Sequence, residues 1–326
     1  MSLYEKLQEF AKKENIIAGV GSAEAFDELK LYLKNKVVPF VNYTVEERTE
    51  PKLIMESVKS IVAIGLSYNV VYSRIKDSAV RGNMSAGAVG TDYHIEVTEK
   101  LKKLKEEIIP WCEYKIFADT GPLSDRDVAI RCSLGSRGKN GCVINSKIGG
   151  MFFIGYMLTD IEFDRWEAKK GEEVLCGDCD RCIKACPNGA IDDGICDYSK
   201  CISYITQKKG VLTDREYESL GRQIYGCDVC QRVCPYNKEY EKGESEYAYP
   251  DICRLLKMSN KEFKKIYGNT AAGWRGKRTL QRNAIAVLGN MGDKRAVHIA
   301  EEFLLNENED LRSAAEYALK KLKKGD

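Results

Sequence analysis

The sequence lacks three features that would each place a protein in a class at once. It has no run of about 18 apolar residues, as a membrane-spanning helix requires, so we expect no membrane partner. Its N-terminus, Met1 to Lys6, has no hydrophobic stretch that directs export, so we expect a cytoplasmic protein. No GxGxxG or P-loop motif follows an expected strand, which leaves nucleotide binding without support.

Cysteine is present, but not in the pattern of a disulfide scaffold. Thirteen cysteines in 326 residues are too few for such a scaffold, and disulfides need an oxidising compartment. Eight of them instead form two short runs, each closed by a proline, and one cysteine between the runs. These eight are Cys176, Cys179, Cys182, Cys186, Cys201, Cys227, Cys230 and Cys234.

The spacing of the first run, C-x2-C-x2-C-x3-C-P, is that of bacterial ferredoxins that bind [4Fe–4S] clusters. Thiolate sulfur suits the iron of such clusters, and eight thiolates are enough for two of them. Zinc is the alternative, but three cysteines two residues apart before a Cys-Pro step are poor zinc spacing. The other five cysteines are expected to be ordinary thiols: Cys112, Cys132, Cys142, Cys196 and Cys253.

The length and the patterning predict a multidomain α+β or α/β protein. Residues 1–166 are expected to form an α/β domain, 167–253 a two-cluster ferredoxin-like domain, and 254–326 HEAT-like helical repeats. So few repeats cannot fold alone, so the last segment must dock on the rest of the protein. The elements expected are strands at 60–68, 114–118 and 150–155, and helices at 93–109, 279–289, 294–305 and 309–322.

The C-terminal segment is basic. From Arg254 to Asp326 it holds 16 Lys or Arg against 9 Asp or Glu, which favours a polyanionic partner. A solvated lysine-rich helix face is the alternative. Cations and a tryptophan that could contact RNA phosphates and bases gather at Trp274, Arg275, Lys277, Arg278 and Arg282, although Trp274 could instead pack in the core.

Several motifs outside the cysteine runs resemble the epoxyqueuosine reductase family, cobalamin-dependent iron–sulfur enzymes of queuosine-tRNA biosynthesis. The resemblance covers most of the chain. The motifs that carry it are Asp92-Tyr-His94, Asp119-Thr-Gly-Pro-Leu-Ser-Asp-Arg126, Leu134-Gly135, Gly138-Lys-Asn140, Cys201-Ile-Ser-Tyr204 and Tyr225-Gly-Cys-Asp-Val-Cys230.

This resemblance implies an N-terminal domain that binds cobalamin without a protein ligand on cobalt, and two [4Fe–4S] clusters that feed it electrons. The substrate would be an epoxide on a modified base in a tRNA anticodon loop, reduced to an alkene with loss of water. We expect a monomer supplied by a flavodoxin- or ferredoxin-like donor of low potential. The implied ligand sets are Cys176, Cys179, Cys182 and Cys234 for one cluster, and Cys186, Cys201, Cys227 and Cys230 for the other.

Loss of water requires a general acid, and the resemblance makes Asp119 the first choice. A carboxyl enclosed by cofactor and apolar walls should have a raised pKa, which suits a proton donor. Without the family, an Asx turn is the simpler interpretation of Asp119. Asp125 is the second choice, although it could instead pair with Arg131 or face solvent.

The resemblance also implies cofactor contacts at His94, Arg126, Gly138, Lys139 and Asn140. His94 could instead be a capped or core histidine, and Arg126 could form a surface ion pair.

Two stretches depart from the family pattern. Ser136 replaces an aromatic residue, and the segment Met84 to Thr91 lacks the usual Arg-Tyr pair. Both belong to the expected pocket, so two alternatives stay open: a cobalamin-dependent reductase of another small molecule, on the platform that reductive dehalogenases share, and a non-catalytic electron carrier.

Overall fold

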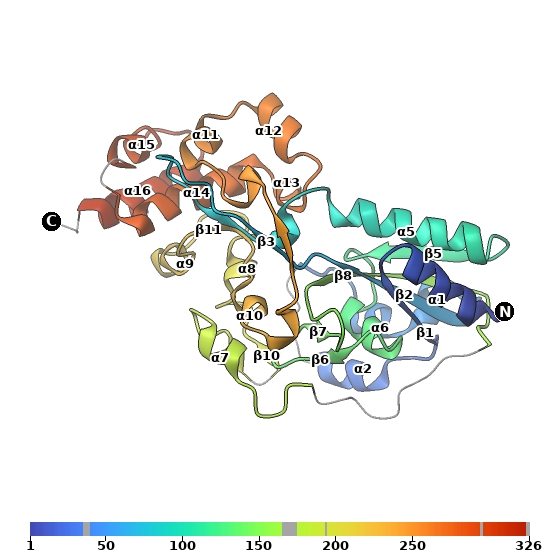
Figure 1. Cartoon of the computed structure of the whole chain (residues 1–326). Helices are drawn as coiled ribbons and strands as arrows, with labels where there is room; N and C mark the ends of the chain where they lie inside the picture. The colour runs from blue at the N-terminus through green and yellow to red at the C-terminus, as the bar shows by residue number, and fades with distance from the viewer. Residues whose placement is uncertain (35–39, 165–174, 193, 294–295, 324–326) are drawn as a thin grey trace. The chain divides into compact units, whose positions relative to one another are not determined.

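The computed structural model of the chain describes residues 1–34, 40–164, 175–192, 194–293 and 296–323 (Figure 1). Its contacts divide the chain into two compact units, neither of which is one continuous stretch. Unit 1 comprises Met1–Tyr68, Tyr93–Asp180 and Cys234–Glu239, and unit 2 comprises Asn69–Asp92, Arg181–Val233 and Tyr240–Asp326. The three-domain division stays a prediction, and its boundary at 166/167 lies outside the described residues.

Unit 1 is built on a four-stranded antiparallel sheet with the strand order β1-β2-β8-β5. The central strand β2 is buried over most of its length, as expected of a strand that is covered on both faces. The three strands predicted from the sequence are confirmed, the last one starting later and running further than expected. The bounds are β1 (Ile17–Ser22), β2 (Ser60–Ser67), β5 (Tyr114–Ala118) and β8 (Phe152–Thr159).

Helices cover both faces of this sheet. Side chains alternate along β2, so Val62 and Ile64 pack on one face and Ile61 and Ala63 on the other. The first face carries α1 (Leu3–Lys13) and the predicted helix α5 (Tyr93–Ile108); the second carries α6 (Asp125–Arg131). Ser2 and Glu5 form a capping box that fixes the start of α1.

The remaining elements of unit 1 are short. The loop between β5 and α6 holds Asp119, and a hairpin holds the Gly138-Lys-Asn motif. The bounds of these elements are α2 (Asp27–Leu33), α3 (Val45–Thr49), α4 (Pro51–Ile54), β6 (Ser136–Arg137), β7 (Val143–Ile144) and the 3-10 turn η2 (Pro235–Asn237).

Unit 2 is mainly helical, with short two-stranded ladders. Its strands and 3-10 turns are β3 (Val70–Tyr72), β4 (Asn83–Met84), η1 (Ala86–Ala88), β9 (Ile191–Asp192), β10 (Ile195–Cys196), β11 (Gln223–Tyr225), β12 (Glu241–Gly243) and η3 (Glu246–Ala248). Its helices are α7 (Arg181–Ala185), α8 (Ile202–Ile205), α9 (Asp214–Ser219), α10 (Val229–Arg232), α11 (Ile252–Lys257), α12 (Asn260–Tyr267), α13 (Ala271–Trp274), α14 (Lys277–Met291), α15 (Val297–Glu301) and α16 (Glu309–Lys323).

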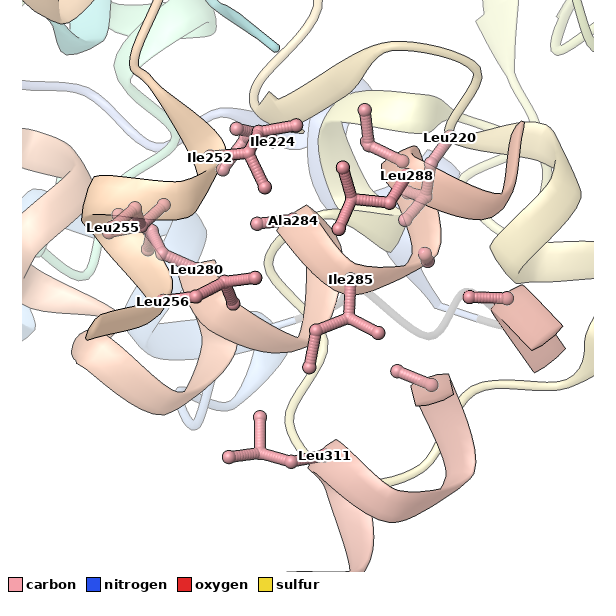
Figure 2. Packing of buried hydrophobic residues seen from close by; sticks show 14 of the residues in the cluster. Leu220, Ile224, Ile252, Leu255, Leu256, Leu280, Ala284, Ile285, Leu288 and Leu311 are labelled. Atoms are coloured by element: carbon pink, nitrogen blue, oxygen red, sulfur yellow. The ribbon is translucent and has the colours of Figure 1, made fainter. Parts of the chain in front are cut away.

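The core of unit 2 surrounds α14. Figure 2 shows Leu280, Ala284 and Ile285 of this helix among apolar side chains of α11 and α16, with Ile224 of β11 in the same cluster. The C-terminal helices therefore share one core with the segment that carries cluster cysteines, in agreement with the expectation that they cannot fold alone.

The end of α14 corrects one expectation. The predicted stop at Gly289 is wrong: the helix continues to Met291, and Gly292 terminates it with a left-handed φ of 66°. Gly289 instead allows close packing of α14 on α16, because a Cβ at that position would lie 2.6 Å from the Cα of Ala318. Of the third predicted helix, 294–305, residues 294 and 295 lie outside the described residues, and the observed α15 is shorter.

Candidate active site and iron–sulfur cysteines

Asp119 lies just after β5 with a left-handed backbone, φ 59°. Aspartate adopts this conformation more readily than most side chains, but it remains uncommon and often marks a functional position. The carboxylate does not make the Asx turn considered as the simpler interpretation. It lies instead beside the side chains of His94 and Tyr93.

His94 is the nearest titratable partner of this carboxylate. Its Nε2 lies 3.5 Å from the Oδ2 of Asp119, and the Asp119 side chain is 57% exposed. Tyr93 and His94 begin α5, and the Tyr93 ring stacks on the His94 ring at 4.1 Å. Phe153 of β8 stacks on Tyr93 at 4.2 Å, and Tyr68 stacks on Phe153 at 4.3 Å. A stack of rings therefore anchors the imidazole to the sheet.

The expected direction of the Asp119 pKa is wrong. Desolvation acts to raise it, but polar contacts with His94 and Tyr93, together with the charges of His94 and Arg126, hold the pKa of Asp119 below its ordinary value. Asp125 shows the raised pKa instead. Desolvation and the charge of Asp119 raise the pKa of Asp125 to about 8.

Asp125 is neither paired with Arg131 nor turned to solvent, the two alternatives left by the sequence. Arg131 donates to the backbone carbonyls of Glu24 and Ala25 and lies over the Phe26 ring. The Oδ1 atom of Asp125 is buried and has no hydrogen-bond partner within the described structure. Arg126, the next residue, is exposed, and its charge acts on both carboxyls.

The Gly138-Lys-Asn motif lies in the β6–β7 hairpin, beside a predicted cluster ligand. The backbone N–H of Lys139 donates to the Sγ of Cys176 over 3.5 Å. The buried Asn140 accepts from the backbone N–H of Cys142, and Gly138 donates to the carbonyl of Cys142. Hydrogen bonds to sulfur tune the potential of an iron–sulfur cluster, so this loop can influence electron transfer as well as cofactor binding.

Three predicted ligands of the first cluster lie together in unit 1. Burial raises the pKa of Cys234, and the nearby thiols of Cys176, Cys179 and Cys142 act in the same direction. Cys142 was expected to be an ordinary thiol, and its nearness to the group was missed. The one sequence signal for this nearness is the position of Cys142 close to the Gly138-Lys-Asn motif.

Three predicted ligands of the second cluster lie together in unit 2. Burial raises the pKa of Cys227 to about 11, and Cys201 and Cys186 add to this effect. The N–H of Ala190 donates to the Sγ of Cys186 over 3.2 Å. Cys230 lies on α10, which packs against α7.

The donor set suits iron–sulfur clusters better than a single metal ion. No three His, Cys, Asp or Glu side chains in the described part of the chain are close enough to hold one ion. A four-iron cluster holds its ligand sulfurs further apart than a single ion does. The two groups of cysteines can therefore bind [4Fe–4S] clusters although they are too widely spaced for one ion. No disulfide joins two cysteines of the described residues.

The basic segment divides into exposed and buried parts. Trp274 is 59% exposed, and the guanidinium of Arg275 lies 4.2 Å from its ring centroid. Arg278 is exposed, and Lys277 donates to the carbonyl of Met258. The alternative interpretation, that Trp274 packs in the core, is therefore wrong.

Arg282 must be removed from the RNA-contact set. Its side chain is fully buried and donates to the carbonyls of Lys208 and Gly210 and to the Oδ1 of Asn283. Asn283 in turn donates to the carbonyls of Thr206 and Ile224. Helical periodicity places Arg282 on the inward face of α14. There its guanidinium donates to buried backbone carbonyls and is not available to an RNA phosphate.

Two family models match the chain. Residues 175–237 match the 4Fe-4S double cluster binding domain, and residues 48–120 match the family described as Epoxyqueuosine reductase QueG, DUF1730. The chain is therefore a double-cluster iron–sulfur oxidoreductase of mixed α/β fold.

Whole-chain relatives identify the family. An epoxyqueuosine reductase of Lactococcus garvieae is 36% identical over 341 residues, covering 98% of this chain and 96% of the relative. The chain belongs to the epoxyqueuosine reductase family. The alternative of a non-catalytic electron carrier is thereby wrong.

Two solved structures show related proteins in informative states. The Bacillus subtilis epoxyqueuosine reductase, with an aspartate catalytic loop swung out of the active site, has a TM-score of 0.87 and 34% identity, covering 98% of this chain and 90% of that chain. An epoxyqueuosine reductase with an epoxyqueuosine-modified tRNA-Tyr stem loop has a TM-score of 0.82 and 30% identity, covering 98% and 100%. No helix of the described residues is long and apolar enough to cross a membrane.

Proposed function

We propose that this protein reduces epoxyqueuosine to queuosine in tRNA. The observation that carries the proposal is the Asp119 carboxylate on its left-handed loop, 3.5 Å from the Nε2 of His94, in a chain of this family. Removal of the epoxide oxygen as water consumes two electrons and two protons and leaves an alkene.

The electrons pass through two [4Fe–4S] clusters. The proposed ligands of one are Cys176, Cys179, Cys182 and Cys234, supported by the grouping of three of them in unit 1. The proposed ligands of the other are Cys186, Cys201, Cys227 and Cys230, supported by the similar grouping in unit 2. A flavodoxin- or ferredoxin-like donor supplies them, and the protein acts as a monomer.

The residues around Asp119 would hold cobalamin. The imidazole of His94 lies 3.5 Å from the Asp119 carboxylate and would contact that carboxylate rather than the cofactor metal. Arg126 is exposed and can meet a corrin amide or the phosphate of the nucleotide loop, and the Gly138-Lys-Asn hairpin can supply further contacts. When bound, cobalamin supplies the two electrons that break the carbon–oxygen bond.

Asp119 acts as the general acid, and His94 controls its proton. At neutral pH, the lowered pKa of Asp119 leaves the carboxylate ionised until a proton reaches it. The imidazole of His94, 3.5 Å from Oδ2, positions the carboxylate, and the exposed Asp119 side chain is accessible to substrate. The relative with a swung-out aspartate loop supports the assignment of such a loop to catalysis.

The tRNA contacts unit 2 through the exposed part of the basic segment. Trp274 with Arg275 offers a stacking surface for a base, and Lys277 and Arg278 meet phosphates. The helices α14 to α16, which we interpret as HEAT-like, hold this segment in place. The relative bound to a modified tRNA stem loop supports RNA as the partner.

Reconstituted protein tests this function directly. With cobalamin, both clusters and a low-potential reductant, it should convert epoxyqueuosine to queuosine in an anticodon stem loop, followed by mass spectrometry of the nucleosides. Asp119→Asn should lower kcat about 10²–10⁴-fold because the amide cannot donate the proton, with unchanged corrin and cluster absorption.

Asp127→Asn is the matched control, because Asp127 is a nearby carboxylate that pairs with Arg137. It should retain activity. Normal turnover of Asp119→Asn would overturn the acid assignment, and a wild-type protein that reduces no epoxide would overturn the function itself.

A further inference from the structure

The buried amide of Asn283 joins two segments that carry proposed ligands of the second cluster. Asn283 belongs to α14, and its side chain is fully buried. Its Nδ2 donates to the carbonyl of Thr206 and to the carbonyl of Ile224, each over 2.8 Å. Thr206 directly follows α8 and Ile224 belongs to β11, so this one side chain holds together two segments that are separate in the sequence.

One turn of helix connects Thr206 to the proposed ligand Cys201. Cys201 directly precedes α8, and its carbonyl accepts from the N–H of Ile205 over 2.9 Å. At the other end of the turn, the N–H of Thr206 donates to the carbonyl of Ile202 over 2.9 Å. Because these hydrogen bonds close the turn, its two ends move together. The contact of Asn283 with Thr206 therefore restrains Cys201.

A further hydrogen bond connects Thr206 to the segment of Cys227. The N–H of Gly226 donates to the Oγ1 of Thr206 over 3.0 Å, and Gly226 directly precedes Cys227. Gly226 has a left-handed φ of 68°, so the chain turns sharply between β11 and the cysteine. On the other side of Cys227, the carboxylate of Asp228 accepts from the N–H of Ala86 over 2.7 Å. The backbone is thus held on both sides of this proposed ligand.

Arg282 sets the orientation of the Asn283 amide. Its Nη2 donates to the Oδ1 of Asn283 over 2.8 Å. With that oxygen engaged, the amide NH2 group faces the two carbonyls, and each of its protons has one acceptor. A buried carbonyl that loses its partner keeps the full cost of leaving water, so the arrangement favours one position of both segments.

We propose that Asn283 is a positioning residue for the second [4Fe–4S] cluster. The proposal rests on the proposed function, in which Cys201 and Cys227 are ligands of the same cluster. Asn283 acts through backbone carbonyls and, with Thr206, holds the two cysteine segments together. The buried side of α14 therefore serves the iron–sulfur chemistry, whereas the exposed residues at its start are those proposed to meet RNA.

Iron release to a chelator tests this proposal without any turnover. In reconstituted Asn283→Leu, about half of the iron, that of one cluster, should be released about 10–100-fold faster than in the wild type. The other half should keep its wild-type rate. After the fast release, the electron paramagnetic resonance spectrum should match that of Cys227→Ala, which lacks a proposed ligand of the second cluster.

Gln281→Met is the matched control. Gln281 is also buried in α14, and its Nε2 donates to the carbonyls of Leu255 and Leu256 over 3.2 Å and 2.9 Å. Both carbonyls belong to α11, which carries no proposed ligand. This variant should lose stability in urea much as Asn283→Leu does, yet release iron at the wild-type rate. Equal acceleration in the two variants would show a general loss of stability and overturn the proposal.

Thr206 keeps the proposal testable if Asn283→Leu does not fold. Thr206→Val removes the hydroxyl that accepts from Gly226 and should also accelerate iron release, whereas Thr206→Ser keeps the hydroxyl and should release iron as the wild type does. A wild-type rate in Asn283→Leu or in Thr206→Val would contradict the positioning role. If Cys227→Ala keeps all its iron, the proposed ligand set fails and the inference with it. If Cys227→Ala loses one cluster while Asn283→Leu retains both normally, the inference alone fails.

Discussion

The cysteine runs and the Asp119 loop, to which we assign the chemistry of this protein, differ in how their sequence relates to their proposed roles. In the runs, residue type and spacing within a few positions predict the role of each thiol. In the loop, Asp119 and Asp125 are the same residue type six positions apart, yet their pKa values shift in opposite directions. Local pattern predicts metal ligands, whereas protonation depends on which side chains the fold brings together.

The largest effect should come from Cys227. Cys227→Ala removes a proposed ligand, so the protein should lose one cluster and all turnover, seen as a loss of about half the bound iron with electron paramagnetic resonance of the remaining cluster.

Cys142→Ala is the matched control for the cysteine runs. Cys142 lies near the first group but outside the proposed ligand set, so this variant should retain the iron of both clusters. Loss of iron from Cys142→Ala would show that spacing alone does not define the ligands.

Two arginines of α14, Arg282 and Arg278, test whether the fold or the local sequence pattern decides the role of a basic residue. Arg282→Ala should destabilise the protein by about 2–4 kcal/mol in urea unfolding, because it leaves buried carbonyls and Asn283 unsatisfied. Its neighbour in the sequence pattern, Arg278, is exposed. Arg278→Ala should keep the stability, weaken stem-loop binding a few-fold and reduce the salt slope by about 1. Equal losses of stability and of stem-loop binding in the two variants would contradict the assignment of Arg282 to the core and Arg278 to the RNA-contact surface.

The last test is the pH dependence of stability at Asp125. The folded-state pKa of about 8 exceeds the ordinary value of 3.8, so its contribution to stability is complete at low pH and is lost as the pH rises toward 8. Asp125→Asn removes this loss. Its gain in unfolding free energy should be near zero at acidic pH and should grow as the pH rises toward 8. A gain that does not change with pH would contradict the raised pKa.

The sequence predicted three of the four sheet strands, α5 and the family, because apolar runs and motif spacing are local. It missed β1, Ile17–Ser22. It also placed His94 and Asp119 in one site through the family motifs. It did not predict the burial of Arg282, since a basic cluster does not reveal which cation turns inward. Nor did it predict the protonation of Asp125, because Arg48, Tyr156 and Asp119 come from separate elements.

The ring stack that ends at His94 restrains the imidazole of His94 more tightly than the Asp119 carboxylate beside it. His94 can move only if Tyr93, Phe153 and the central strand β8 give way. Asp119 is a left-handed residue in a loop, and polar contacts with His94 and Tyr93 hold its carboxylate. We therefore expect the imidazole to keep its position, because packing holds it, and the Asp119 carboxylate to be the more mobile partner of the two.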